Sequence, residues 1–366
     1  MVRRSTFELL LSLRICIPLL FCVGLLAPSQ AGAAPLYSLV DLGTFAGKVT
    51  PAGTRDAQPT AINASGQVVG SALTPGAHPQ EHAFRYDGAL QDLGTLGGTT
   101  SVATAINASG QVVGSALMGG ELTREHAFLF DGKLRDLGTL GGITSVATGI
   151  SADGHVVGWS YPSDDSLHEH AFLYTHFMRD LGTLGGLASA ATGVNGNGHV
   201  VGWSNIAGHP LGEHAFLYDG RLHDLGTLGG TTSVATAIDA SDHVVGWSYV
   251  TMGAVHEHAF LFDGTLHDLG TLGGVSSAAT AINATGQVVG WSYALGDAQH
   301  KHAFLYDGSL HDLNGQLDTS GQDWIVFEAT GINDAGQIAA YAWNRTTGRC
   351  RAVLLTPRAD TAARHD

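Results

Sequence analysis

Residues 125–138 have the sequence Glu-His-Ala-Phe-Leu-Phe-Asp-Gly-Lys-Leu-Arg-Asp-Leu-Gly, and most of this stretch recurs along the chain at intervals of 44 residues. The triplet His-Ala-Phe occurs six times, at His82, His126, His170, His214, His258 and His302. An Asp-Leu-Gly follows ten residues after the histidine, at Asp92, Asp136, Asp180, Asp224 and Asp268. A fixed period of this length indicates that one supersecondary unit is copied and stacked, so the fold follows from one copy.

Each copy is predicted to contain four short strands, which in the second copy span residues 102–107, 111–115, 126–130 and 133–137. No segment shows helical periodicity. Asp131-Gly132 joins the last two strands, and we expect a two-residue type I′ turn there, with positive φ at both residues. The third strand is apolar on both faces, which is typical of a sheet packed between two neighbours. The first strand, rich in small residues, is expected to lie innermost.

Four antiparallel strands in about 44 residues are typical of a β-propeller blade. A parallel β-helix is the main alternative, but its coils usually have shorter periods. Residues 39–44 match a fourth strand without its blade, and residues 351–355 match a third strand whose blade lacks a fourth. Pairing 36–42 with the strand around 351–355 would complete seven blades. We therefore predict an all-β, seven-bladed β-propeller closed by the pairing of its N-terminal strand with the C-terminal blade.

The first residues match an export signal. Arg3, Arg4 and Arg14 are basic, residues 15–27 form an apolar run, and Ala31-Gly32-Ala33 fits the small-residue rule for cleavage. The run is too short to span a bilayer, so we expect no membrane anchor. We predict a cleaved signal peptide over 1–33, one propeller over 34–357 and a flexible polar tail over 358–366. The protein is then exported, to the periplasm or the extracellular space.

The net charge of −15 argues against nucleic acid as a partner, because binding to phosphates requires a basic surface. The repeated segments Asp-Leu-Gly-Thr-Leu-Gly-Gly, Ala-Ile-Asn-Ala-Ser-Gly-Gln-Val-Val-Gly and Glu-His-Ala-Phe-Leu resemble those of the HAF-repeat family, which are extracellular bacterial proteins named for the triplet. The resemblance covers most of residues 36–355 and departs in the seventh copy, where Arg351-Ala352-Val353 replaces His-Ala-Phe. It implies an exported repeat protein and supplies no catalytic residues.

The triplet histidines suggest a metal or catalytic site, but a residue present in nearly every blade is better suited to a structural role. We therefore predict that the six histidines and the five aspartates of Asp-Leu-Gly are structural, with no metal and no cofactor. A two-residue turn would pair Ala127 with Asp136 and place His126 and Asp136 on opposite faces of the blade. The aspartate of one blade would then bond the histidine of the next blade.

Function is expected on the face that carries the variable loops. In a four-stranded antiparallel blade, the connections between strands two and three emerge beside those between strand four and the next blade. This loop-bearing face contains nearly all the residues that are not copied around the ring, and binding usually depends on such loops. The two longest connections either bind a ligand or cover the seam. Candidate binding residues are Arg55, Asp56, Asp164, Asp165, His168, Asp323, Trp324 and Arg345.

The absence of a recognisable catalytic motif favours a secreted, monomeric, non-catalytic protein that binds a polysaccharide or a partner protein. The alternative is an extracellular polysaccharide lyase or hydrolase, whose acid and base would come from the same unrepeated residues. Fold alone cannot decide between them.

Overall fold

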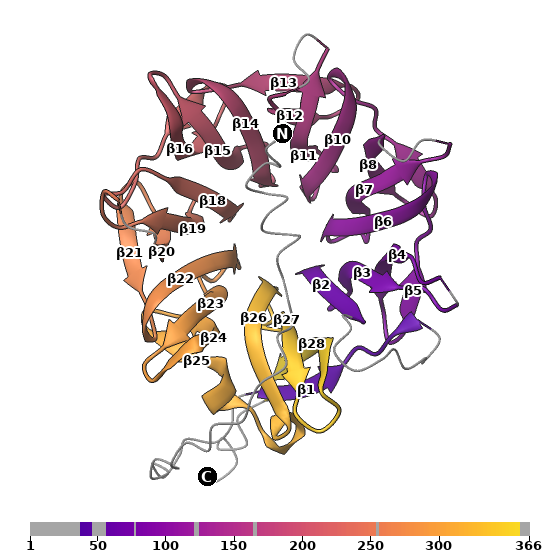
Figure 1. Cartoon of the computed structure of the whole chain (residues 1–366), viewed down its shortest axis with the longest axis vertical. Coiled ribbons are helices and arrows are strands. Elements are labelled where there is room, and N and C mark those ends of the chain that lie inside the picture. The colour runs from indigo at the N-terminus through magenta and orange to yellow at the C-terminus, as the bar shows by residue number, and fades with distance from the viewer. Residues whose placement is uncertain are drawn as a thin grey trace, which may run out of the picture.

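The computed structural model describes residues 37–45, 56–76, 78–120, 124–163, 167–253 and 256–358, apart from the side chains of residues 210, 211 and 298. These residues form seven four-stranded antiparallel sheets arranged as blades around a central axis (Figure 1). The predicted seven-bladed propeller is confirmed. The predicted signal peptide and residues 359–366 of the predicted tail lie outside the described residues.

The first three blades each contain four consecutive strands of the chain. Blade 1 contains β2 (Ala57–Ile62), β3 (Val68–Leu73), β4 (Glu81–Tyr86) and β5 (Leu90–Asp92). Blade 2 contains β6 (Gly97–Ile106), β7 (Val112–Met118), β8 (Glu125–Phe130) and β9 (Leu134–Asp136). Blade 3 contains β10 (Gly141–Ile150), β11 (Val156–Pro162), β12 (His170–Tyr174) and β13 (Met178–Gly182).

The remaining blades follow the same order. Blade 4 contains β14 (Gly185–Val194), β15 (Val200–Ile206), β16 (His209–Tyr218) and β17 (Leu222–Asp224). Blade 5 contains β18 (Ser233–Ile238), β19 (Val244–Tyr249), β20 (Glu257–Phe262) and β21 (Leu266–Gly270). Blade 6 contains β22 (Gly273–Ile282), β23 (Val288–Ala294), β24 (Asp297–Tyr306) and β25 (Leu310–Asp312). Two 3₁₀ helices, η2 (Leu313–Gln316) and η3 (Thr319–Gly321), follow.

Blade 7 combines the two ends of the chain. It contains β26 (Trp324–Ile332), β27 (Ile338–Asn344) and β28 (Arg349–Pro357), and β1 (Tyr37–Asp41) is its outer strand. Leu39 lies opposite Leu355 in the antiparallel pair of β1 and β28. The predicted closure is therefore confirmed, and the ring has no unpaired strand at its seam.

The first strand of each blade lies nearest the axis, as expected (Figure 1). The core lies between the blades, where the phenylalanine of every His-Ala-Phe triplet is fully buried. Close packing also explains the Val-Val-Gly motif of the second strand. A Cβ atom on Gly114 would lie 1.9 Å from the Val102 carbonyl oxygen, so any side chain there would displace the neighbouring strand.

The hairpin between the last two strands differs from the sequence prediction. Phe130 lies opposite Leu134, so the loop has three residues, 131–133, instead of two. Gly132 has a φ of 111°, whereas Asp131 is not among the described residues with positive φ. The turn is therefore not of type I′, and the pairing of β8 with β9 is shifted by one residue from the predicted register.

Side chains near the axis join each blade to the next. The amide of Asn63 donates to the carbonyl of Asn107 at 3.1 Å, and Asn107 donates to Ser151 at the same distance. Asn333 of blade 7 donates to the carbonyl of Asn63 at 3.0 Å, which makes the same contact across the seam. The side chains of these three asparagines are thus committed to the ring. Glycosylation of Asn63 or Asn107, which occur in Asn-x-Ser sequons, would require breaking it.

The insertion after blade 6 covers the outer edge of β1. The Asp318 amide donates to the Tyr37 carbonyl at 2.8 Å, and Leu39 donates to the Ser320 hydroxyl at 2.7 Å. Leu313 is fully buried in the core at the seam. This insertion therefore has the seam-covering role that was one of the two sequence-based alternatives. The other long connection falls largely on residues 46–55, which lie outside the described residues.

Removing residues 37–44 should open the ring, because β28 would lose its partner strand and expose an unpaired edge. We expect a lower midpoint of thermal unfolding and concentration-dependent association in size-exclusion chromatography. A truncated protein that remains monomeric with an unchanged unfolding midpoint would contradict the structural importance of this closure.

Candidate functional site

Each triplet histidine contacts an aspartate ten residues further along the chain. The distance from histidine Nδ1 to the nearest carboxylate oxygen is 2.9 Å for His82–Asp92 and 3.0 Å for His126–Asp136. It is 2.7 Å for His170–Asp180 and 2.9 Å for both His214–Asp224 and His258–Asp268. The sixth pair, His302–Asp312, is the shortest at 2.6 Å. Asp312 was not predicted, because Asp-Leu-Asn replaces Asp-Leu-Gly there.

These pairs lie within single blades, so the prediction that aspartate and histidine bridge neighbouring blades is wrong. The cause is the longer hairpin loop. Asp136 lies opposite Phe128 instead of Ala127, and this shift of one residue moves Asp136 to the same face as His126. The carboxylate also accepts the amide N–H of Gly138 at 2.8 Å, so it stabilises the Asp-Leu-Gly turn as well.

The middle residue of the triplet makes a further bond between blades. The Ala83 amide donates to the hydroxyl of Ser101 in the next blade at 2.9 Å, and Ser101 donates to the Gly94 carbonyl at 2.5 Å. The same alanine–serine bond recurs at Ser145, Ser189, Ser233 and Ser277. These buried serines were not singled out from the sequence, because Ser and Thr are common throughout the first strands.

No group of three or more His, Cys, Asp or Glu residues in the described part of the chain is arranged to hold a metal ion. Nor does that part contain a helix long and apolar enough to cross a bilayer. The geometry of the histidine–aspartate pairs is what a structural role requires, and the role itself stays a prediction.

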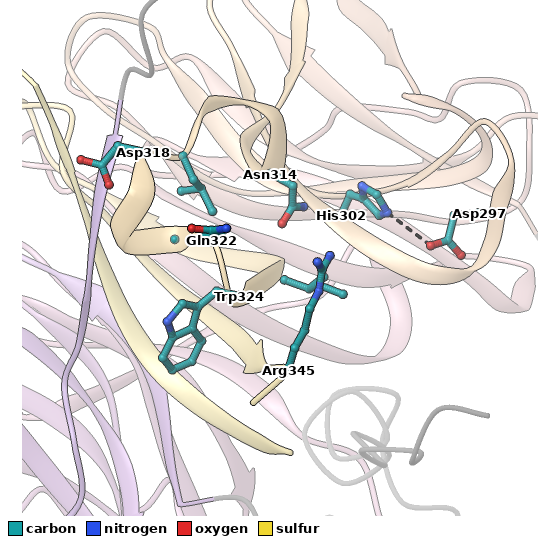
Figure 2. Close-up of a pocket in the computed structure, with 10 residues that line it drawn as sticks. Asp297, His302, Asn314, Asp318, Gln322, Trp324 and Arg345 are labelled. Carbon is teal, nitrogen blue, oxygen red and sulfur yellow. Dashed lines mark hydrogen bonds and ion pairs between the residues drawn. The ribbon is translucent and has the colours of Figure 1, made fainter. Parts of the chain in front are cut away.

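A cavity of about 300 Å³ lies between blades 6 and 7 on the loop-bearing face (Figure 2). Strand β24 contributes Asp297 and His302, and the connection into blade 7 contributes several residues between 314 and 325. The loop between β27 and β28 contributes Arg345. Its lining residues are Asp297, His302, Asn314, Leu317, Asp318, Gly321, Gln322, Trp324, Ile325 and Arg345. Three separate segments of blades 6 and 7 thus meet in one cavity.

The two carboxylates in the cavity wall have partners within the protein. Asp297 accepts hydrogen bonds from the backbone of Gln299 and His300 and lies 2.9 Å from Nδ1 of the His300 ring. Burial alone would raise the pKa of Asp297, but these hydrogen bonds hold it below its ordinary value. Asp318 accepts from the amide and hydroxyl of Ser320 and lies 3.2 Å from Arg358. Neither carboxylate is available as an unpartnered ligand group.

His302 lies between two carboxylates. Its Nδ1 is 2.6 Å from Asp312, and its Nε2 is 3.5 Å from Asp297, the contact drawn in Figure 2. Both ring nitrogens can donate only when the imidazole is protonated. The hydrogen bond to Asp312 accordingly raises the pKa of His302 above its ordinary value of 6.5. Burial would raise the pKa of Asp312, but the bond from His302 holds it below 3.8.

The structure brings some of the candidate binding residues together. Trp324 and Arg345 line the cavity, and Asp323 lies beside them, exposed, with its carbonyl accepting the Arg345 amide at 2.7 Å. His168 belongs to the loop before β12, in blade 3, and does not line the cavity. Arg55, Asp164 and Asp165 lie outside the described residues.

Asp56 is not presented to the loop-bearing face. It is 1% exposed, and its carboxylate lies 3.2 Å from Arg351 and 3.7 Å from Arg349 on β28. This ion pair connects blade 1 to blade 7 across the seam. It also explains why arginine replaces histidine in the seventh triplet. Asp56 therefore leaves the set of candidate ligand-binding residues.

The cavity contains residues that the sequence did not single out, namely Asp297, Asn314 and Gln322. Asn314 has a structural task, since its side chain donates to the Val326 carbonyl at 2.9 Å and accepts from the Val326 amide at 2.8 Å. The signal that could have identified this region is the change from Asp-Leu-Gly to Asp-Leu-Asn at residues 312–314.

A second cavity, of about 270 Å³, surrounds the axis on the opposite face. Its wall consists of the equivalent ends of the first strands and the turns that follow them, including Asn63, Asn107 and Asn333. Because these asparagines donate to neighbouring blades, the cavity wall is part of the ring that holds the propeller together.

Comparisons with known proteins show the fold. Residues 228–354 match a family model described as a protein of unknown function, DUF3466. A search of curated proteins returns no match. The β-propeller domain of the Trilobed protease from Pyrococcus furiosus, with an open velcro topology, has a TM-score of 0.54 at 8% identity, over 82% of this chain and 95% of that chain.

Pyrococcus horikoshii acylaminoacyl peptidase has a TM-score of 0.50 at 10% identity, over 81% of this chain and 52% of that chain. The present chain thus spans about half of that peptidase. Identities this low show a shared β-propeller architecture and nothing about activity.

The structure predicts different costs for two substitutions at the junction of blades 4 and 5. His214→Ala should lower the free energy of unfolding by at most about 1 kcal/mol, because the carboxylate of its partner Asp224 is 43% exposed and can be hydrated. Ser233→Ala leaves the buried Ala215 amide without its acceptor and should cost about 1–3 kcal/mol. Denaturant unfolding measures both values. The reverse order would contradict the greater contribution to stability assigned here to the alanine–serine bond.

The pair of His302 and Asp312 should make stability depend on pH. The raised pKa of His302 means that its contribution is present below pH 6.5 and is lost as pH rises through that raised value. The lowered pKa of Asp312 means that its contribution is present above pH 3.8 and is lost as pH falls through the lowered value. The stability difference between the wild type and His302→Gln should therefore be largest between these limits. A difference that is constant from pH 5 to about 9 would refute the pairing.

Proposed function

We propose that this chain is an exported, non-catalytic β-propeller of the HAF-repeat family that binds an extracellular polymer or partner protein through its loop-bearing face. The six copies of the triplet support the family assignment, and the features of residues 1–33 support export. The cavity between blades 6 and 7 carries the proposal. It is built largely from residues that are not copied around the ring, and it opens on the face with the variable loops.

The same face also exposes large apolar side chains. Ile143, Leu187 and Val275, near the starts of β10, β14 and β22, are 51–57% exposed. Three others lie in the loops between second and third strands and are 70–85% exposed, namely Leu167, Met252 and Leu295. Six of the eight exposed large apolar side chains in the described residues thus lie on this face, whereas Phe177, in the β12–β13 hairpin, lies on the opposite face. Exposed apolar residues on a rigid scaffold favour recognition of a macromolecule over a small metabolite.

The carboxylates of the cavity favour binding over catalysis. A general acid or base must exchange a proton with the substrate. Asp297 is held by His300 and lies beside His302, while Asp318 is held by Ser320 and Arg358. Lyase or hydrolase activity remains the alternative outcome of the experiment below.

The experiment screens the purified protein against immobilised polysaccharides and extracellular proteins and measures polysaccharide turnover in parallel. The double variant Gln322→Ala/Arg345→Ala changes two exposed side chains and should abolish binding. Its free energy of unfolding should change by no more than about 0.5 kcal/mol, as is usual for surface substitutions. Turnover of a bound polysaccharide would contradict the non-catalytic assignment.

The matched control lies on the opposite face. His155 and His199 occupy a repeat position where Gln67 and Gln111 stand in other blades, so His155→Gln/His199→Gln restores the residue of the neighbouring copies. This control should bind like the wild type. Loss of binding in the control but not in the loop-face variant would place the working face on the other side.

A further inference from the structure

The polar groups of the cavity between blades 6 and 7 divide into those that are satisfied within the protein and those that are not. Asp297, His302, Asn314 and Asp318 all have the internal partners described above. Arg345 and Gln322 differ. Within the part of the chain that the structure describes, neither side chain makes a hydrogen bond or an ion pair, and both are exposed. Because both groups are exposed and hydrated in the free protein, a guanidinium and an amide are available to a ligand.

Arg345 is the charged group that remains for a ligand. Figure 2 shows its side chain extending toward Asn314 and His302, with Gln322 and Trp324 on the other side of the cavity. A guanidinium presents five donors and no acceptor, in a planar arrangement that matches a carboxylate bidentately. The Asp297 and Asp318 carboxylates are held by other cations or donors and do not pair with Arg345, so its guanidinium is available to a carboxylate of a ligand.

The apolar side chains of the cavity favour a ligand that contains a ring with one hydrophobic face. Trp324 is half-buried and packs against the core at the seam, so its ring is held in place. Leu317 and Ile325 extend this apolar surface. A volume of about 300 Å³ lies at the lower end of the range for ligand sites and suits a short piece of a longer chain.

We propose that this cavity binds a uronic acid unit of an acidic polysaccharide, with Arg345 holding the carboxylate, Gln322 bonding a hydroxyl group and Trp324 lying against the sugar ring. This inference rests on the proposed binding function and specifies its ligand.

The net charge of −15 does not prevent this binding at physiological ionic strength. Repulsion between a polyanion and the rest of the protein is screened over about 8 Å, whereas the carboxylate and Arg345 interact in direct contact. Charge-assisted bidentate hydrogen bonds of this kind are among the stronger polar contacts in proteins. The ligand is therefore selected by the cavity and not by the overall charge.

The experiment compares two probes that differ in charge and in one methyl group on each carboxyl. Polygalacturonate and its methyl ester share one backbone, and the ester lacks the carboxylate. The full chain should bind the acid at least about tenfold more tightly than the ester in equilibrium binding, a difference of about 1.4 kcal/mol. Arg345→Gln should remove this preference. Arg345→Lys keeps the charge without the planar fork, and should retain part of it. Arg221→Gln, an exposed arginine beside the Asp219-Gly220 turn of blade 4, is the control and should bind like the wild type.

Three results would overturn the inference. Equal affinity for the acid and the ester, with both lost in the Gln322→Ala/Arg345→Ala variant, would leave the proposed binding function standing but reject the uronate. Binding of dextran sulfate as tight as that of polygalacturonate would show a general preference for anions. Binding to neither probe, with an extracellular protein bound through the same cavity, would make the partner a protein. Thermal unfolding of each variant separates loss of the site from loss of the fold.

Discussion

The pairing of β1 with β28 is the interaction on which the remaining structure depends. Each blade buries both of its faces against neighbours, so a single blade cannot form a core by itself. Only a closed ring gives every blade two neighbours and leaves no strand edge exposed at the seam. The bond from Asn333 to the Asn63 carbonyl and the ion pair of Asp56 with Arg351 cross the same seam. Three kinds of contact, at the outer edge, at the axis and between the blades, therefore join the two ends of the chain.

The demands of the ring explain which residues are copied. Phenylalanine fills the space between blades, alanine bonds the serine of the next blade, and the histidine contacts the aspartate within one blade. Residues with these tasks are not available to bind a ligand. Chemistry specific to one place in the ring has to come from positions that depart from the repeat. The cavity between blades 6 and 7 follows this rule, since the insertion after Asp312 and the loop at Arg345 form much of its wall.

The same segment contributes to stability and to the candidate site. Residues 313–321 cover the edge of β1, and the short helices η2 and η3 also form one side of the cavity. Asn314 links the two tasks, because its bonds to Val326 fix the path of the chain just after Trp324. The backbone of a site built on a segment that is held in place in this way is pre-organised, so less ordering of the chain is needed when a ligand binds.

The repeat of 44 residues and the alternation of strands and turns determined the class of fold, the number of blades and the way the ring closes. These features depend on local patterning and on counting, which a single sequence contains. The register of the last hairpin was not determined, because Asp-Gly is compatible with loops of two or three residues, and that one residue decides which face Asp136 occupies. Only the tertiary structure showed that Asp56 is buried against Arg351, and that Asp297, Trp324 and Arg345 line one cavity. Those contacts join segments far apart in the chain, and their distances exist only once the ring has closed.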